Sequence, residues 1–214
     1  MTMMKTKEKI KIIQEFLDDI FPNVGCELIY DKDYELVIAV MLSAQTSDIA
    51  VNKVTAILFS KYDSLKKLNE APFEDVCSIL HPIGLYKNKA RHLKEIVKLL
   101  LEKYNENIPS DKKVLTSLPG VGNKTAGVIR AELFNIPELP VDTHVSRIAK
   151  RLKLADENDQ PGAIETKLKK IIESSRQIKM HHQLIHFGRA ICLARNPHCE
   201  KCSLQAFCKE KTNH

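Results

Sequence analysis

The segment LPGVGNKTAGV, residues 118–128, contains three glycines, which make its backbone unusually flexible, and a single lysine. The chain has seven glycines in all, yet Gly120, Gly122 and Gly127 stand close together here, and Lys124 lies between the second and the third. Glycine permits tight turns and lets the backbone approach a ligand closely. The segment is therefore a candidate for a turn built beside a functional amine.

A helix is expected on each side of this turn. Ser110 or Asp111 can cap a short helix that ends before Gly120. Gly122 then allows the chain to reverse before a second helix over residues 123–134. The sequence thus predicts a helix-hairpin-helix.

The hairpin is a candidate site for a DNA phosphate. In such a turn the amides of Gly120, Val121 and Gly122 can point outward near a helix N-terminus, where free N–H groups suit an anion. Contacts of this kind hold DNA of any sequence. The alternative is a glycine-rich turn that only packs two helices together.

Lys124 falls in the first turn of the second predicted helix. The positive end of the helix dipole and partial burial would both favour a neutral, nucleophilic amine there. The alternative is a surface lysine whose charge is solvated.

A carboxylate follows eighteen residues later, in LPVDTHVSRIAKRL. Asp142 is predicted to be a helix N-cap, and it can also face Lys124 across a cleft. We expect His144 to pack or hydrogen-bond nearby. A basic face of the same helix, either solvated or suited to phosphates, is formed by Arg147, Lys150 and Arg151.

Composition permits a nucleic-acid partner without requiring one, because the net charge is +6 and the pI is near 8.9. The longest apolar run, residues 36–42, is far shorter than the roughly 20 residues of a membrane span. Charges interrupt the apolar residues of the N-terminus, as they do not in a signal peptide. We expect a cytosolic protein without a membrane partner.

Apolar residues recur at helical spacing over residues 7–21, 92–104 and 163–174. The apolar run 36–42 is interpreted as a buried helix. Clear period-2 alternation is missing, which favours an all-α fold. Loops are expected at residues 21–25, 104–110, 135–140 and 154–162.

Four of the six cysteines form the pattern C-x6-C-x2-C-x5-C: Cys192, Cys199, Cys202 and Cys208. Four thiolates in one short loop fit a tetrahedral zinc or an iron–sulfur cluster. Only one close pair is present, whereas a zinc ribbon normally has two, so the pattern favours iron and sulfur. Disulfides are the weaker alternative in a reducing compartment.

Taken in order, LPGVGNKTAGV, VDTHVSR and the four cysteines closely resemble the endonuclease III family of DNA base-excision glycosylases. The resemblance extends to MLSAQTSD at 41–48 and IGLYKNKA at 83–90, so it covers nearly the whole chain. It implies two helical lobes flanking a DNA-binding cleft. A six-helix barrel lobe would span residues 26–136, and residues 1–25 and 137–214 would form an iron–sulfur lobe.

The resemblance also implies roles for individual residues. Lys124 matches the nucleophile, Asp142 the catalytic carboxylate, and the four cysteines the ligands of a [4Fe-4S] cluster. Gln45 matches a residue that fills the space left by an everted base, and Leu85 one that wedges the opposite strand. The alternatives are an ordinary polar residue at a helix end for Gln45 and a core leucine for Leu85.

The activity implied is that of a bifunctional glycosylase and abasic-site lyase acting as a monomer on duplex DNA. It would remove oxidised pyrimidines through a lysine Schiff base and cleave 3′ to the site by β-elimination. Two departures from the family pattern are Asn123, where arginine is usual, and Gly127, where asparagine is usual. Alternatives are a monofunctional mismatch glycosylase, a metal-stapled DNA-binding module without lyase activity, and a zinc protein.

Overall fold

A computed structural model describes residues 6–209 as helices joined by loops, with no strand in that range. The predicted all-α fold is confirmed. No helix in the described part of the chain combines the length and apolarity needed to cross a membrane. The chain divides into two compact units, which are described separately: Cys26–Phe134, and the segments up to Gly25 and from Asn135 onward.

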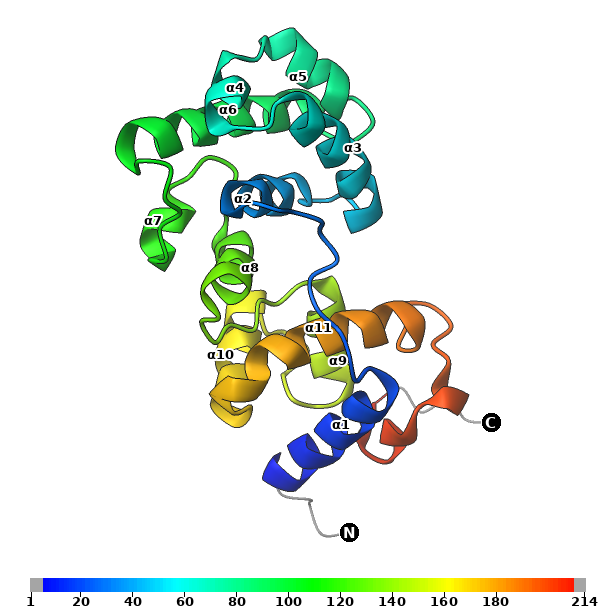
Figure 1. Cartoon of the computed structure of the whole chain (residues 1–214). Coiled ribbons are helices and arrows are strands. Elements are labelled where there is room, and N and C mark those ends of the chain that lie inside the picture. The colour runs from blue at the N-terminus through cyan, green and yellow to red at the C-terminus, as the bar shows by residue number, and fades with distance from the viewer. Residues whose placement is uncertain (1–5, 210–214) are drawn as a thin grey trace. The chain divides into compact units, whose positions relative to one another are not determined.

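The first unit, Cys26–Phe134, contains the hairpin and has its own apolar core. Helix α2 lies in this core and packs against α3, α6 and α8 (Figure 1). The unit's helices are α2 (Asp33–Leu42), α3 (Asp48–Lys61), α4 (Leu65–Glu70), α5 (Phe73–Leu80), α6 (Tyr86–Lys103), α7 (Lys112–Thr116) and α8 (Asn123–Phe134).

The second unit combines the N-terminal helix with the C-terminal third of the chain around a separate apolar core. Helix α11 packs against both α9 and α1. The unit's elements are α1 (Thr6–Ile20), α9 (Thr143–Arg151), α10 (Pro161–Ile171), α11 (Ser174–Ala190), and the 3-10 helices η1 (Cys199–Lys201) and η2 (Ser203–Phe207).

The run 36–42 is a buried helix, as predicted, because α2 is buried continuously from Tyr34 to Leu42. The stripe predicted over residues 163–174 is displaced. Helix α10 begins at Pro161, where proline suits the first turn, and ends at Ile171. Ile172 is extended, and the side-chain amide of Gln177 donates to its carbonyl at 3.1 Å, so the chain turns there into α11.

The hairpin between α7 and α8 requires glycine at one position. Asp111, not Ser110, caps α7, because its carboxylate accepts from the amide of Val114 at 2.9 Å. Gly120 has a φ of 74°, whereas Gly122 is not among the residues with positive φ. The expectation that Gly122 reverses the chain is wrong, and the reversal uses Gly120.

Alanine at Gly120 should destabilise the protein by roughly 1 to 3 kcal/mol, because the backbone there is left-handed. A Cβ would also lie 2.6 Å from Nδ1 of His92 and 3.1 Å from Cγ of Met41. The matched control is Gly122→Ala, whose Cβ would meet nothing within 4 Å. Thermal unfolding should show a lower Tm for Gly120→Ala alone, and equal Tm values would contradict this account.

Candidate DNA-binding and catalytic site

The hairpin presents fewer free amides than the sequence suggested. Val121 is buried, and its N–H donates to the carbonyl of Leu118 at 3.1 Å, so this amide is not available to a phosphate. Helix α8 makes its first bond from the amide of Ala126 to the carbonyl of Gly122, at 2.9 Å. Helix geometry therefore leaves the N–H groups of the first turn of α8 without helical partners. The candidate anion site lies in that turn.

Lys124 belongs to the same turn, one residue after the start of α8. Its side chain is exposed, so the partial burial considered from the sequence is wrong for this lysine. An exposed amine beside free helix N–H groups can reach an atom of a bound DNA backbone without any rearrangement of the core.

Asp142 caps α9, as predicted, and its carboxylate accepts a hydrogen bond from the amide of Val145 at 2.8 Å. The residue is only half-buried. Because the bond uses one carboxylate oxygen, the helix fixes the orientation of the group.

His144 and Arg147 lie on the side of α9 that faces α11. A Cβ at Gly188 would lie 2.8 Å from Cβ of His144, so the absence of a side chain there permits the close packing of the two helices. The guanidinium of Arg147 donates to the carbonyls of Gly188 at 2.9 Å and Cys192 at 2.8 Å. Its Nη2 also lies 3.2 Å from Nδ1 of His144.

The side chain of Arg151 is buried, so the interpretation of a basic face suited to phosphates is wrong for this residue. Arg151 donates to the carbonyls of Leu193 at 2.6 Å and Ala194 at 3.3 Å, and approaches Sγ of Cys192 at 3.4 Å. Together with Arg147, it ties α9 to the start of the segment that carries the four clustered cysteines, residues 192–208, which we call the cysteine loop.

All four clustered cysteines line one small cavity, between α9, the end of α11 and the 3-10 helices. Each is partly buried, and none forms a disulfide. Burial raises the pKa of the Cys202 thiol, and the other three thiols add to this rise, so the four sulfurs are close enough to interact. A free thiolate is disfavoured in such a place, and a positively charged metal centre would compensate for it. A partly buried, disulfide-free set of four thiols around one cavity fits an iron–sulfur cluster.

Gln45 and Leu85 share an unusual backbone. Gln45 lies between α2 and α3 with a φ of 55°, and Leu85 immediately precedes α6 with a φ of 59°. Both side chains are exposed, and Leu85 exposes 62% of its surface, so the interpretation of Leu85 as a core leucine is wrong. Non-glycine residues with positive φ cost energy and cluster at functional sites.

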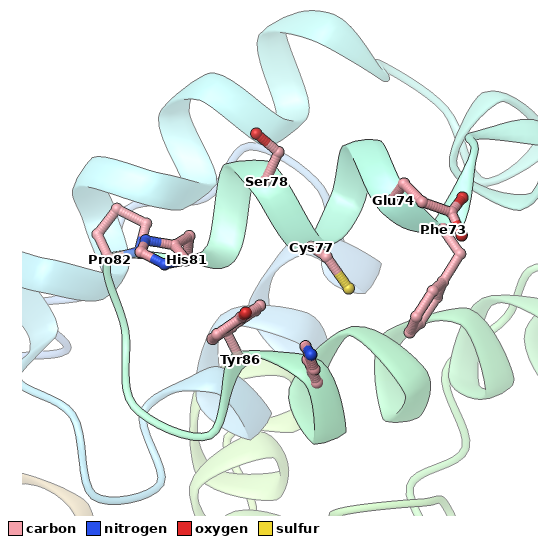
Figure 2. A pocket seen from close by; sticks show the side chains of 8 residues that line it. Phe73, Glu74, Cys77, Ser78, His81, Pro82 and Tyr86 are labelled. Carbon is pink, nitrogen blue, oxygen red and sulfur yellow. The ribbon is translucent and has the colours of Figure 1, made fainter.

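The loop that carries Leu85 is anchored on both sides. Ile83 is buried in the core of the unit. The ring of Tyr86 lies 5.0 Å from that of His81, and both line a pocket between α5 and α6 (Figure 2). Leu85 therefore projects from a loop whose flanking residues are packed.

A buried lysine near these loops escaped the sequence analysis. Lys89 is only 5% exposed, and its ammonium donates to Oγ1 of Thr46 at 2.6 Å. The signal was its spacing, because Lys89, Leu93 and Ile96 continue one stripe of α6.

Comparison with known proteins identifies the family. Residues 38–174 match the profile of the HhH-GPD superfamily of base excision DNA repair proteins, and residues 192–208 that of the iron–sulfur binding domain of endonuclease III. A protein named Endonuclease III from Bacillus subtilis is 38% identical over 207 residues, which are 97% of this chain and 94% of the relative. This chain belongs to the endonuclease III family.

Other members of the endonuclease III family agree with this assignment. Endonuclease III of Rickettsia conorii is 43% identical over 187 residues, 87% of this chain and 89% of that protein. A solved non-covalent endonuclease III–DNA complex superimposes with a TM-score of 0.92 at 41% identity, covering 97% of both chains. A trapped covalent endonuclease III–DNA intermediate gives the same values. The cofactor of the chain is a [4Fe-4S] cluster.

Proposed function

We propose that this member of the endonuclease III family is a bifunctional base-excision repair enzyme, a DNA glycosylase and abasic-site lyase that removes oxidised pyrimidines from duplex DNA. The observation that carries the proposal is Lys124, an exposed amine in the first turn of the helix that follows the hairpin. The relatives include a protein trapped covalently on DNA, which is the outcome expected of an amine nucleophile.

The hairpin and the first turn of α8 hold a backbone phosphate next to the lesion. The damaged base is everted, and the amine of Lys124 attacks C1′ of its sugar while the bond to the base breaks and the base leaves with the bonding electrons. Loss of the amine proton and opening of the sugar ring give a Schiff base. Removal of a proton from C2′ then expels the 3′ phosphate, and water releases the enzyme.

Asp142 is proposed to stabilise the positive charge that develops on the sugar and to accept the proton of Lys124. Its hydrogen bond from the amide of Val145 supports this role, since a capping carboxylate is held rigidly. His144 and Arg147 are proposed to contribute at the DNA surface. Nε and Nη2 of Arg147 donate to the carbonyls of Cys192 and Gly188, which fixes the position of its guanidinium.

Gln45 and Leu85 are proposed to occupy the duplex during base eversion, Gln45 in the vacated space and Leu85 against the opposite strand. Their exposure and left-handed backbones support this role, because such strain persists where the fold holds a side chain for function.

The cysteines Cys192, Cys199, Cys202 and Cys208 are proposed to be the four ligands of the cluster. When bound, the cluster would cross-link the loop through the four thiolates and so give it structural order. The hydrogen bonds from Arg147 and Arg151 to this loop support a structural role, because they join it to the helix that begins at Asp142.

Replacing Cys202 with alanine should abolish the brown colour of the purified protein, because a cubane cluster needs four thiolates. Loss of the ligand should also lower the Tm. Replacing Cys77, which lies outside the cysteine loop, is the control. Visible absorption and iron content measure the result, and a Cys202→Ala protein with wild-type iron content would refute the ligand assignment.

We further propose a six-helix barrel lobe over residues 26–136 and an iron–sulfur lobe formed by residues 1–25 and 137–214. We also propose that the protein works as a monomer in the cytoplasm, associated with the nucleoid through DNA.

Borohydride trapping on a duplex with one oxidised pyrimidine tests the proposed function. A covalent protein–DNA adduct together with free base and a cut strand would support it. Base release without trapping would indicate a monofunctional glycosylase, and binding without either would indicate a DNA-binding module.

A further inference from the structure

The buried ammonium of Lys89 pairs with no carboxylate among residues 6–209. The side chain is 5% exposed, and burial alone lowers the pKa of its ammonium. A lysine without a paired charge is costly to bury, and a hydrophobic residue would continue the apolar stripe of α6 at lower cost. The position therefore calls for a reason beyond packing.

The side-chain hydrogen bond of Lys89 supplies that reason, because it connects α6, just after Leu85, to the loop after α2. The ammonium donates to Oγ1 of Thr46 at 2.6 Å, and Thr46 directly follows Gln45. The backbone amide of Lys89 makes a helical hydrogen bond to the carbonyl of Leu85 at 3.0 Å, so the lysine stands one turn after Leu85 whatever its side chain does. The side chain of Lys89 thus joins the first turn of α6 to the loop after α2, across 43 positions of sequence.

Both ends of this connection carry an exposed side chain on a left-handed backbone, Gln45 and Leu85. A residue with positive φ stays in that conformation only if its surroundings enforce it. The threonine hydroxyl also donates to the carbonyl of Ala44, at 3.4 Å, so the bond from Lys89 acts on the turn that contains Gln45.

We propose that Lys89 and Thr46 form a positioning bridge that fixes Gln45 and Leu85 relative to each other, so that both side chains enter the duplex in one step. The proposal rests on the proposed function, since it assumes that these two residues enter DNA. Lys89 is a positioning residue and does not contact the reacting atoms. Without the bridge, each loop would have to find its inserted position separately, at an entropic cost in the eversion step.

Substitutions at Thr46 test the bridge with little change in shape. Thr46→Val removes the acceptor but keeps the branched side chain, and Thr46→Ser keeps the hydroxyl. Each is made in a Lys124→Ala protein, which cannot turn over, with its cluster intact. The probe is a duplex with an oxidised pyrimidine opposite 2-aminopurine, whose fluorescence rises when the base is unstacked.

The expected result is a rise that is slower by about tenfold in Thr46→Val and close to the parent rate in Thr46→Ser. Lys89→Met should match Thr46→Val. Leu85→Ala should slow insertion by a smaller factor in the Thr46→Val background than in the background with Thr46 intact, because the bridge acts through Leu85. Affinity for undamaged duplex should change little, since phosphate contacts are untouched.

Lys94→Met is the matched control for stability. Lys94 also belongs to α6, and its ammonium donates to the carbonyls of Leu68, Asn69 and Ala71 at the end of α4, away from both loops. It should lower the Tm without slowing the fluorescence rise. An unchanged rate in Thr46→Val, or equal slowing in Lys94→Met, would overturn the bridge. No rise in the Lys124→Ala parent would instead refute the eversion step of the proposed function.

Discussion

Replacing Lys124 with alanine should eliminate the borohydride-trapped adduct and reduce strand cleavage at an abasic site by about 10³-fold or more. The alanine protein retains the hairpin, because the side chain of Lys124 is exposed and packs against nothing in the core. DNA affinity should fall only modestly, since one phosphate-proximal charge is lost. The measurements are trapping, base release and binding on the same duplex.

The matched control for this prediction is Lys113→Ala. Lys113 is an exposed lysine of α7, on the other helix of the hairpin. Its replacement by alanine therefore changes the net charge by the same amount as Lys124→Ala does. It should trap as the wild type does. If Lys124→Ala still forms the adduct, the nucleophile is another amine and the assignment of Lys124 fails.

Local chemistry made much of the fold predictable from the sequence. Helix α8 spans the predicted residues 123–134, and the apolar run at 36–42 is helical and buried. The errors concern local details of the backbone that depend on residues close in space but outside the segment itself. Gly120 has the left-handed backbone of the hairpin, and His92 and Met41 leave no room for a side chain there. Helix α10 ends at Ile171, and Gln177 of the next helix binds the carbonyl of Ile172.

The candidate site likewise has features that the sequence predicts and features that it does not. The N-cap role of Asp142 follows from its place before an apolar stripe. The burial of Arg151 does not, because its partners, the carbonyls of Leu193 and Ala194, are 42 and 43 positions away in sequence. From the sequence alone, a charged residue that is buried on a helix face looks the same as one that is solvated, because the acceptors that permit its burial are distant in sequence.

Helix α9 connects the proposed catalytic carboxylate, Asp142, to the cysteine loop. Asp142 caps the N-terminus of the helix, and the arginines of its later turns hold the carbonyls of the cysteine loop. Because a helix is a rigid element, order in the cysteine loop supports the position of Asp142. This gives the iron–sulfur loop a structural influence on the proposed catalytic carboxylate that does not require the cluster to react.

Asparagine at position 142 should separate the charge of Asp142 from its capping role. Asn caps helices as well as Asp does, so Asp142→Asn should keep a Tm close to that of the wild type. The rate of base release should nevertheless fall by about 10²-fold or more, because the amide can neither accept the lysine proton nor balance positive charge. Single-turnover base release and thermal unfolding on the same preparations measure the two effects.

Two further variants complete the comparison. Asp142→Ala should lose the activity and also about 1 kcal/mol of stability, because the amide of Val145 loses its acceptor. Asp111→Asn changes the other capping aspartate, which accepts from the amide of Val114 at 2.9 Å, and should leave the rate of base release unchanged. A wild-type rate in Asp142→Asn would mean that Asp142 serves the helix alone, and the proton of Lys124 would then need another acceptor.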